Sequence, residues 1–174
     1  MDKFKDKDME YCKKIVCLFG LLYACSINAA PTVGEIPYGV LGRDNNGDVI
    51  ELTAYQNKVV IVTFWATWCG PCMRELPVLS GVQKKLGADK LQVIAVTYKE
   101  SRKLYKAIAK ELADYPLILG YDHKGRVAKK YGVEAIPHMV IIGKDGKIRA
   151  VHVGYSEASL PAFVDEINLA LSES

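Results

Sequence analysis

The chain has 174 residues, of which 50% are hydrophobic and 25% are charged, and its formal net charge is +3. This composition is that of an ordinary globular protein, and the length suffices for one well-cored domain but not for two. The nearly balanced charge excludes the strongly basic signature of nucleic-acid-binding proteins, so we expect no nucleic-acid partner.

The first 30 residues differ from the rest of the chain and predict a targeting segment. Charged residues crowd its beginning, and an apolar stretch over residues 15–25 follows. That stretch is shorter than the ~20 residues of a standard membrane span, and small residues come after it. The pattern is typical of a secretory signal, for which we expect cleavage near Ala29 or Ala30.

Two other interpretations of this segment stay open. Lipidation of Cys25 would make the protein a lipoprotein, and an uncleaved segment would tether it to the outer face of a membrane. All three interpretations place the rest of the chain in the periplasm or an equivalent extracytoplasmic compartment. We therefore predict a targeting segment over residues 1–30 and a single domain over residues 31–174.

The five cysteines are distributed unevenly along the chain. Cys12, Cys17 and Cys25 lie in the targeting segment, which leaves only Cys69 and Cys72 in the predicted domain. A domain of this size folds without a framework of structural disulfides, so the remaining pair is free for chemistry.

The predicted domain opens with a hairpin. The turn-forming run Asn45–Asp48 lies between two apolar pairs, Val40–Leu41 and Val49–Ile50. Asn and Gly between such pairs favour a tight turn that joins antiparallel strands. We expect a two-stranded addition ahead of a central sheet.

Strands and helices then alternate, which indicates an α/β domain. Runs rich in β-branched and aromatic residues predict strands at Val59–Trp65, Leu91–Thr97, Pro116–Leu119, His138–Ile142 and Lys147–Val153, the last two joined by a turn at Lys144–Gly146. Helical spacing predicts a helix from the cysteine pair to Gly87 and another from about Ser101, with the apolar stripe Leu104, Ile108 and Leu112. A short helix is expected at Arg126–Tyr131. A last helix carries its apolar residues on one side: Leu160, Phe163, Val164, Ile167 and Leu171.

The cysteine pair stands between a predicted buried strand and the start of a helix. The unpaired amide hydrogens and the positive dipole end of a helix stabilise a thiolate, so we expect Cys69 to be the attacking nucleophile. Cys72 is nearly one helical turn further on, close enough to attack a mixed disulfide that Cys69 has formed. Pro71 favours helix initiation between them. This spacing suits two-electron exchange between a dithiol and a disulfide.

A Cys-x-x-Cys pair also occurs as half of a structural zinc site, which needs about four ligands. The predicted domain offers no second cysteine pair, and His123, His138 and His152 show no short ligand spacing. We therefore expect no metal site and no bound cofactor.

The segment Phe64–Cys72, with the sequence FWATWCGPC, resembles the active-site signature of thioredoxin-like proteins. Further segments are similar to the exported TlpA/ResA-like branch, which is involved in cytochrome c maturation and related thiol reduction: Gly47–Leu52, Lys58–Trp68, Tyr121–Asp122, Tyr131–Val133 and Lys144–Ile148. The resemblance covers residues 34 to 170. It implies a thioredoxin-like α/β fold, in which helices flank a central mixed β-sheet and an N-terminal β-hairpin is added.

The resemblance also implies roles for residues around the cysteines. Ile136–Pro137 resembles the cis-proline segment that faces the pair in this fold, where the backbone before the proline binds an extended substrate. By the same resemblance, Trp68 covers the disulfide and offers substrates an apolar contact, while Trp65 packs below the active-site loop. We expect His138 to line the rim of the site; the alternative is a side chain whose titration makes exchange pH-sensitive.

Two positions separate the chain from general thioredoxin. Thr63 falls where thioredoxin has a buried aspartate that moves the proton of the second cysteine, and threonine cannot take that role. Glu75 lies three residues beyond Cys72 on the same side of the helix, and it resembles the active-site glutamate of the exported branch. We expect Glu75 to assist proton transfer at Cys72. The alternative is an exposed acid that the helix dipole favours in the first turn.

These features predict a thiol-disulfide oxidoreductase that reduces disulfides of exported proteins. Apocytochrome c is a candidate substrate, and a membrane thiol protein is the expected electron donor. The pair would instead serve a disulfide oxidant or isomerase if its reduction potential were high. A further alternative is an exported copper-binding module, although such proteins usually have three residues between the cysteines.

Overall fold

A computed structural model describes residues 30–173 of the chain. The predictions made for the targeting segment, including those on Cys12, Cys17 and Cys25, lie outside the described residues. Among the helices that are described, none combines the length and the apolar character needed to cross a membrane.

Within the described residues, the core is a mixed five-stranded sheet in the order β5-β4-β3-β6-β7. Its strands are β3 (Val59–Trp65), β4 (Leu91–Thr97), β5 (Ile118–Gly120), β6 (His138–Ile142) and β7 (Ile148–Val153). The central strand β3 pairs in parallel with β4 and antiparallel with β6. Every residue of β3 and β4 is buried, as expected for strands that are covered on both faces. The predicted central mixed sheet is therefore confirmed.

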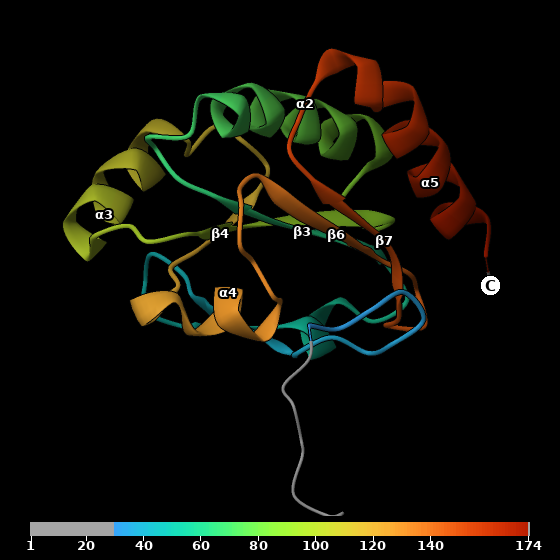
Figure 1. Ribbon diagram of the computed structural model, residues 1–174, viewed down its shortest axis with the longest axis horizontal. Helices are drawn as coiled ribbons and strands as arrows, with labels where there is room; N and C mark the ends of the chain where they lie inside the picture. The colour runs from blue at the N-terminus through green and yellow to red at the C-terminus, as the bar shows by residue number, and fades with distance from the viewer. Residues whose placement is uncertain (1–29, 174) are drawn as a thin grey trace, which may run out of the picture.

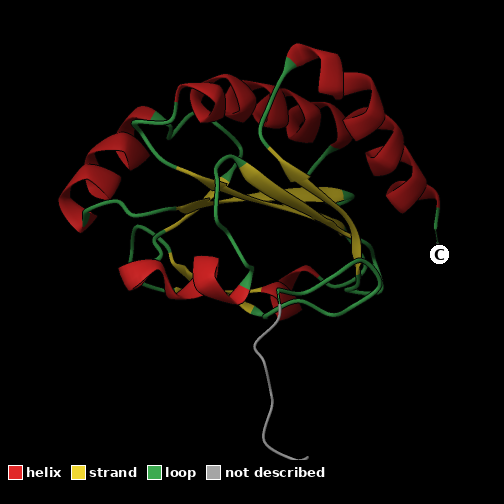
Figure 2. Ribbon diagram, viewed as in Figure 1, coloured by secondary structure: helices red, strands yellow, loops and turns green. Residues whose placement is uncertain are grey.

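Helices lie on both faces of this sheet (Figures 1 and 2). The α-helices in residues 30–173 are α2 (Gly70–Leu86), α3 (Arg102–Glu111), α4 (Arg126–Lys130) and α5 (Leu160–Ser172). Figure 1 shows α2 and α5 over one face and α4 beneath the other. Successive residues of a strand project to opposite faces, so the even-numbered residues of β3 contact the α4 side and the odd-numbered ones the α2 side. Thr63 and Trp65 therefore point toward α2.

The predicted hairpin is present as β1 (Val40–Arg43) and β2 (Val49–Glu51), which pair antiparallel. It docks on the α4 side, where Arg43 forms a bridge with Tyr121, just after β5. Gly42 makes this close approach possible because it has a φ of +100° and a Cβ at this position would lie 2.5 Å from the Tyr121 carbonyl oxygen. Only glycine fits there.

Replacing Gly42 by alanine is expected to lower the free energy of unfolding by about 2 to 5 kcal/mol, because a positive φ and a backbone clash add together. Gly47 is a matched control, since its φ is +102° but nothing lies within 4 Å of its added Cβ. We expect Gly47→Ala to cost only about 1 to 2 kcal/mol. Urea unfolding of both variants measures the difference, and equal losses would contradict the close approach.

Some details of the helices and of β5 differ from the prediction. Leu104, expected in the buried stripe of α3, is 42% exposed, while Tyr105 is buried and its hydroxyl donates a hydrogen bond to a β5 carbonyl at 2.8 Å. Helical spacing alone did not separate these neighbours, and the larger ring with its polar tip occupies the interior. In α5, Val164 is 43% exposed. Strand β5 begins at Ile118 rather than Pro116, which has no N–H for a strand ladder.

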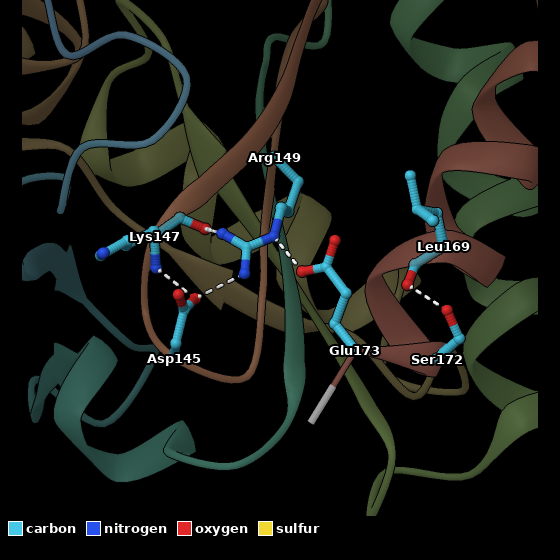
Figure 3. Close-up of polar contacts among 6 residues, drawn as sticks. All are labelled: Asp145, Lys147, Arg149, Leu169, Ser172 and Glu173. Atoms are coloured by element: carbon cyan, nitrogen blue, oxygen red, sulfur yellow. Dashed lines mark hydrogen bonds and ion pairs between the residues drawn. The ribbon is translucent and has the colours of Figure 1, made fainter.

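The C-terminal end of α5 is fastened to the sheet (Figure 3). The Arg149 guanidinium on β7 binds the carboxylate of Glu173, the residue after α5, and also that of Asp145 at 3.0 Å. The backbone N–H of Lys147 donates to Asp145 at 3.1 Å, and this bond, together with Arg149, holds the pKa of Asp145 below its usual value. The far end of α5 is therefore held against β7.

Candidate active site

The two predicted active cysteines are joined in a disulfide bond where β3 ends and α2 begins. Cys69 is the N-cap residue of α2, and its sulfur accepts a hydrogen bond from the backbone N–H of Cys72 at 3.2 Å. The positive end of the helix thus points at the Cys69 sulfur. Such a position favours a thiolate once the bond is reduced.

The two cysteines differ in their surroundings. Cys72 is fully buried, whereas Cys69 is 5% exposed. Cys69 also follows Trp68 in the chain, and Trp68 is 61% exposed. Both sulfurs belong to an apolar cluster together with Trp65, Ala66, Leu76, Ala95 and Leu112. An incoming group therefore reaches Cys69 first. The described part of the chain holds no cluster of three or more His, Cys, Asp or Glu side chains suited to a metal ion.

The peptide bond between Ile136 and Pro137 is cis, as predicted. The pairing of β3 with β6 runs up to Phe64 and His138, so the proline lies one residue beyond this pair, at the edge of the sheet where β3 ends. Ile136 packs against the cluster that contains both cysteines. The structure thus brings the cis-proline segment and the cysteine pair together.

The prediction that His138 lines the rim of the site is wrong. His138 is 7% exposed, and its ring meets that of Phe64 edge-on with the centroids 6.0 Å apart. Burial lowers the pKa of His138, because a charged imidazole would lose its hydration. The side chain is part of the packing beneath the site.

Glu75 lies on α2 three residues after Cys72, and it is 2% exposed. Its Oε2 accepts a hydrogen bond from the Thr63 hydroxyl at 2.7 Å. Burial raises the pKa of Glu75 to about 7, and the hydrogen bond from Thr63 partly opposes this rise. The alternative of an exposed acid in the first turn is therefore wrong. A carboxyl group with this pKa can accept and return a proton at neutral pH.

Glu100 was not singled out from the sequence, yet it holds the loop that carries the cysteines. Its Oε1 accepts hydrogen bonds from both the backbone N–H and the hydroxyl of Thr67, each at 2.7 Å. Glu100 follows β4 at the carboxyl edge of the parallel pair, where sites of α/β proteins gather. That position was the signal available in the sequence. Glu100 is thus a positioning residue for Trp68 and Cys69.

Glu100→Ala is expected to lower the free energy of unfolding by about 1 to 3 kcal/mol, because two donors on Thr67 lose a charged acceptor. It should also slow the reaction of reduced Cys69 with disulfides. Glu100→Gln retains an acceptor oxygen and should restore most of both losses. Denaturant unfolding and stopped-flow exchange measure the pair of variants, and an exchange rate unaffected by Glu100→Ala would contradict the positioning role.

Comparison with known proteins finds thioredoxin-like relatives. The Redoxin family pattern matches residues 28–167. The thioredoxin-like protein YneN of Bacillus subtilis is 35% identical over 114 residues, which are 63% of this chain and 64% of the relative. Thiol-disulfide oxidoreductase ResA of Bacillus thuringiensis is 33% identical over 116 residues, 67% of this chain and 66% of the relative. The matches thus span somewhat less than two thirds of these relatives.

Solved structures agree with the fold. A Chlorobium tepidum protein assigned as a thiol:disulfide interchange protein DsbE superposes with a TM-score of 0.71 at 31% identity, covering 83% of this chain and all (100%) of that one. The exposed lipoprotein thioredoxin of Streptococcus pneumoniae gives a TM-score of 0.63 at 29% identity, covering 76% of this chain and 98% of that one. The predicted thioredoxin-like fold with its N-terminal hairpin is confirmed.

Proposed function

Because the chain belongs to the Redoxin family, whose pattern matches residues 28–167, we propose that it is a thiol-disulfide oxidoreductase that works through Cys69 and Cys72. The observation that carries the proposal is the Cys69 sulfur at the first turn of α2, where it accepts the N–H of Cys72. The names of the ResA relatives support the same activity.

In the reducing direction, the Cys69 thiolate attacks one sulfur of a client disulfide. A bond forms between Cys69 and the client, and the client's other sulfur leaves as a thiolate that takes up a proton. Cys72 then loses its thiol proton and attacks the Cys69 sulfur. The internal disulfide re-forms and the second client thiolate leaves and is protonated. The client gains two electrons and two protons, and the protein's dithiol is oxidised.

Glu75 is the proton acceptor for Cys72 in this proposal. The carboxyl group lies on the same helix one turn after Cys72, in contact with Thr63 and shielded from solvent. A thiol enclosed in an apolar cluster has no direct access to water, so an internal base with a pKa of about 7 serves it well. Trp68 and the backbone at Ile136–Pro137 form the client-binding surface beside Cys69.

We place the protein outside the cytoplasm, as a reductant of exported proteins with a membrane thiol protein as its electron donor. The secretory pattern of residues 1–30 supports export. The likeness to an exposed lipoprotein thioredoxin supports the same compartment and a lipid or membrane tether. Apocytochrome c is the client proposed from the TlpA/ResA-like resemblance.

Trapping mixed disulfides tests the proposal. Cys72→Ser keeps the attacking thiolate but removes the thiol that releases the client, so clients should stay attached to Cys69. The protein is expressed in its native compartment, and acid stops further exchange by protonating the thiolates. Attached partners are identified after reduction. The double variant Cys69→Ser, Cys72→Ser is the matched control. Partners that appear with both variants, or with neither, would contradict exchange through Cys69.

A further inference from the structure

Glu75 lines a cavity that no step of the proposed exchange has yet used. The cavity has a volume of about 320 Å³ and lies between α2, the end of β7 and the start of α5. Its lining is mixed: the apolar residues Val78, Leu79, Met139, Val153, Leu160 and Phe163 lie beside the polar groups of Glu75, His152, Tyr155, Ser156 and Ser159. The volume is far above the ~10 to 15 Å³ needed to hold one water molecule. A path for protons can therefore run from Glu75 through this space.

His152 also lines this cavity. Strand pairing sets Thr63 opposite Met139 and Met139 opposite His152, so the three residues form a row across β3, β6 and β7. Directly paired residues project to the same face, and Thr63 reaches Glu75 on that face. The row spans two strand spacings, about 10 Å. Glu75 and His152 thus line the same cavity, which opens to solvent.

A charged partner fixes the His152 ring. His152 Nε2 contacts the Glu166 carboxylate on α5, and their side chains are 23% and 37% exposed, so the pair sits at the surface. A second contact between the same two elements, Arg149 on β7 with Glu173 after α5, lies at the far end of the helix (Figure 3). The imidazole is therefore both oriented and open to solvent.

We propose that His152, positioned by Glu166, relays the proton of Glu75 between the cavity and solvent during thiol-disulfide exchange. The inference rests on the proposed function, in which Glu75 receives the proton of Cys72 at each turnover and must release it before the next. Glu75 is 2% exposed, so it cannot release the proton directly. Histidine is the side-chain type that exchanges protons near neutral pH.

The other groups around the cavity suit this role less well. Among the described residues that line it, the titratable side chains are Glu75 from α2, His152 from β7 and Tyr155 from the following loop. Two further groups lie next to these residues. Glu166 from α5 contacts His152, and the Cys72 thiol precedes Glu75 on α2. Ser156 and Ser159 contribute hydroxyls, which pass protons along but do not store them. Among these residues, only His152 lines the cavity, is partly exposed to solvent and contacts a charged partner.

The test measures single-turnover oxidation of the reduced full-length protein by glutathione disulfide, followed by tryptophan fluorescence. At about pH 7 a large share of Glu75 carries a proton that must leave first, whereas at about pH 9 Glu75 is already ionised. His152→Ala should therefore slow the reaction about tenfold at neutral pH and leave it near the wild-type rate at high pH. Added imidazole should restore the neutral-pH rate, because the cavity opens where the ring was removed.

Two variants separate a relay from a structural ion pair. Glu166→Gln loosens the pair but keeps the imidazole, so its loss should be smaller and imidazole should not correct it. His123→Ala removes an exposed histidine on the other face of the sheet and should behave as wild type. Equal losses in His152→Ala and Glu166→Gln at both pH values, without rescue, would overturn the relay. An unchanged rate in His152→Ala would overturn the relay alone, whereas a wild-type protein that exchanges no disulfide would overturn the proposed function as well.

Discussion

Replacing Cys69 by serine is expected to reduce thiol-disulfide exchange to the background rate of the reaction without protein. A serine hydroxyl remains protonated near neutral pH, so the first turn of α2 has no thiolate to stabilise and no bond to the client forms. The measurement is the reduction of a protein disulfide by catalytic amounts of the variant, with dithiothreitol as the electron donor.

Cys72→Ser is the informative comparison for this result. The variant should carry out the first attack at a rate near that of the wild type and then stop, because only the buried thiol completes the exchange. In a reaction without dithiothreitol, which would itself reduce the mixed disulfide, one equivalent of mixed disulfide per protein is therefore expected. If Cys72→Ser lost the first attack while Cys69→Ser retained it, the roles assigned to the two cysteines would be reversed.

Glu75→Gln is expected to change both the exchange rate and the dependence of stability on pH. The folded protein raises the pKa of Glu75 from 4.5 to about 7, so between these values it binds a proton that the unfolded chain does not. Stability therefore falls as pH rises through this window and stays lowered above it. The difference of about 2.5 pKa units corresponds to about 3 kcal/mol at 1.36 kcal/mol per unit. The glutamine variant should avoid most of this loss.

Denaturant unfolding at about pH 5 and pH 8 measures the effect: the oxidised variant should gain up to about 3 kcal/mol over wild type at the higher pH and little at the lower one. Exchange by the reduced variant should slow by about 10²-fold at neutral pH, the lower end for loss of a general base. Thr63→Val is the matched control, because losing its hydrogen bond should raise the pKa of Glu75 further and keep the carboxyl group. An unchanged exchange rate and unchanged cysteine titration in Glu75→Gln would rule out the catalytic assignment.

The sequence alone predicted the buried strands, because each is a largely apolar run of residues. Strands β3, β4 and β6 match their predicted bounds because β-branched and aromatic residues fill them from end to end. Helix α2 also matches, since the cysteine pair and Gly87 mark its two ends. The cis bond before Pro137 was expected from the resemblance rather than from any local pattern.

The rest depended on contacts between distant segments. The spacing of Glu75 on the helix is the same whether the side chain is exposed or buried, and Thr63 on the central strand decides it. Glu100 lies 33 residues from Thr67 in sequence, and only the fold brings them together. The burial of His138 against Phe64 arises from the pairing of β3 with β6. Tertiary packing, which local sequence does not encode, set all three positions.

The reduction potential of the Cys69–Cys72 pair tests the central claim most directly. The full-length domain is equilibrated with mixtures of reduced and oxidised glutathione or dithiothreitol at neutral pH, and the reduced fraction is read from thiol labelling. A reductant of exported proteins should show a two-electron transition at about −270 mV, the value for thioredoxin. A transition near about −120 mV, as for a strong oxidant, or a disulfide that does not exchange with the buffer, would contradict the account.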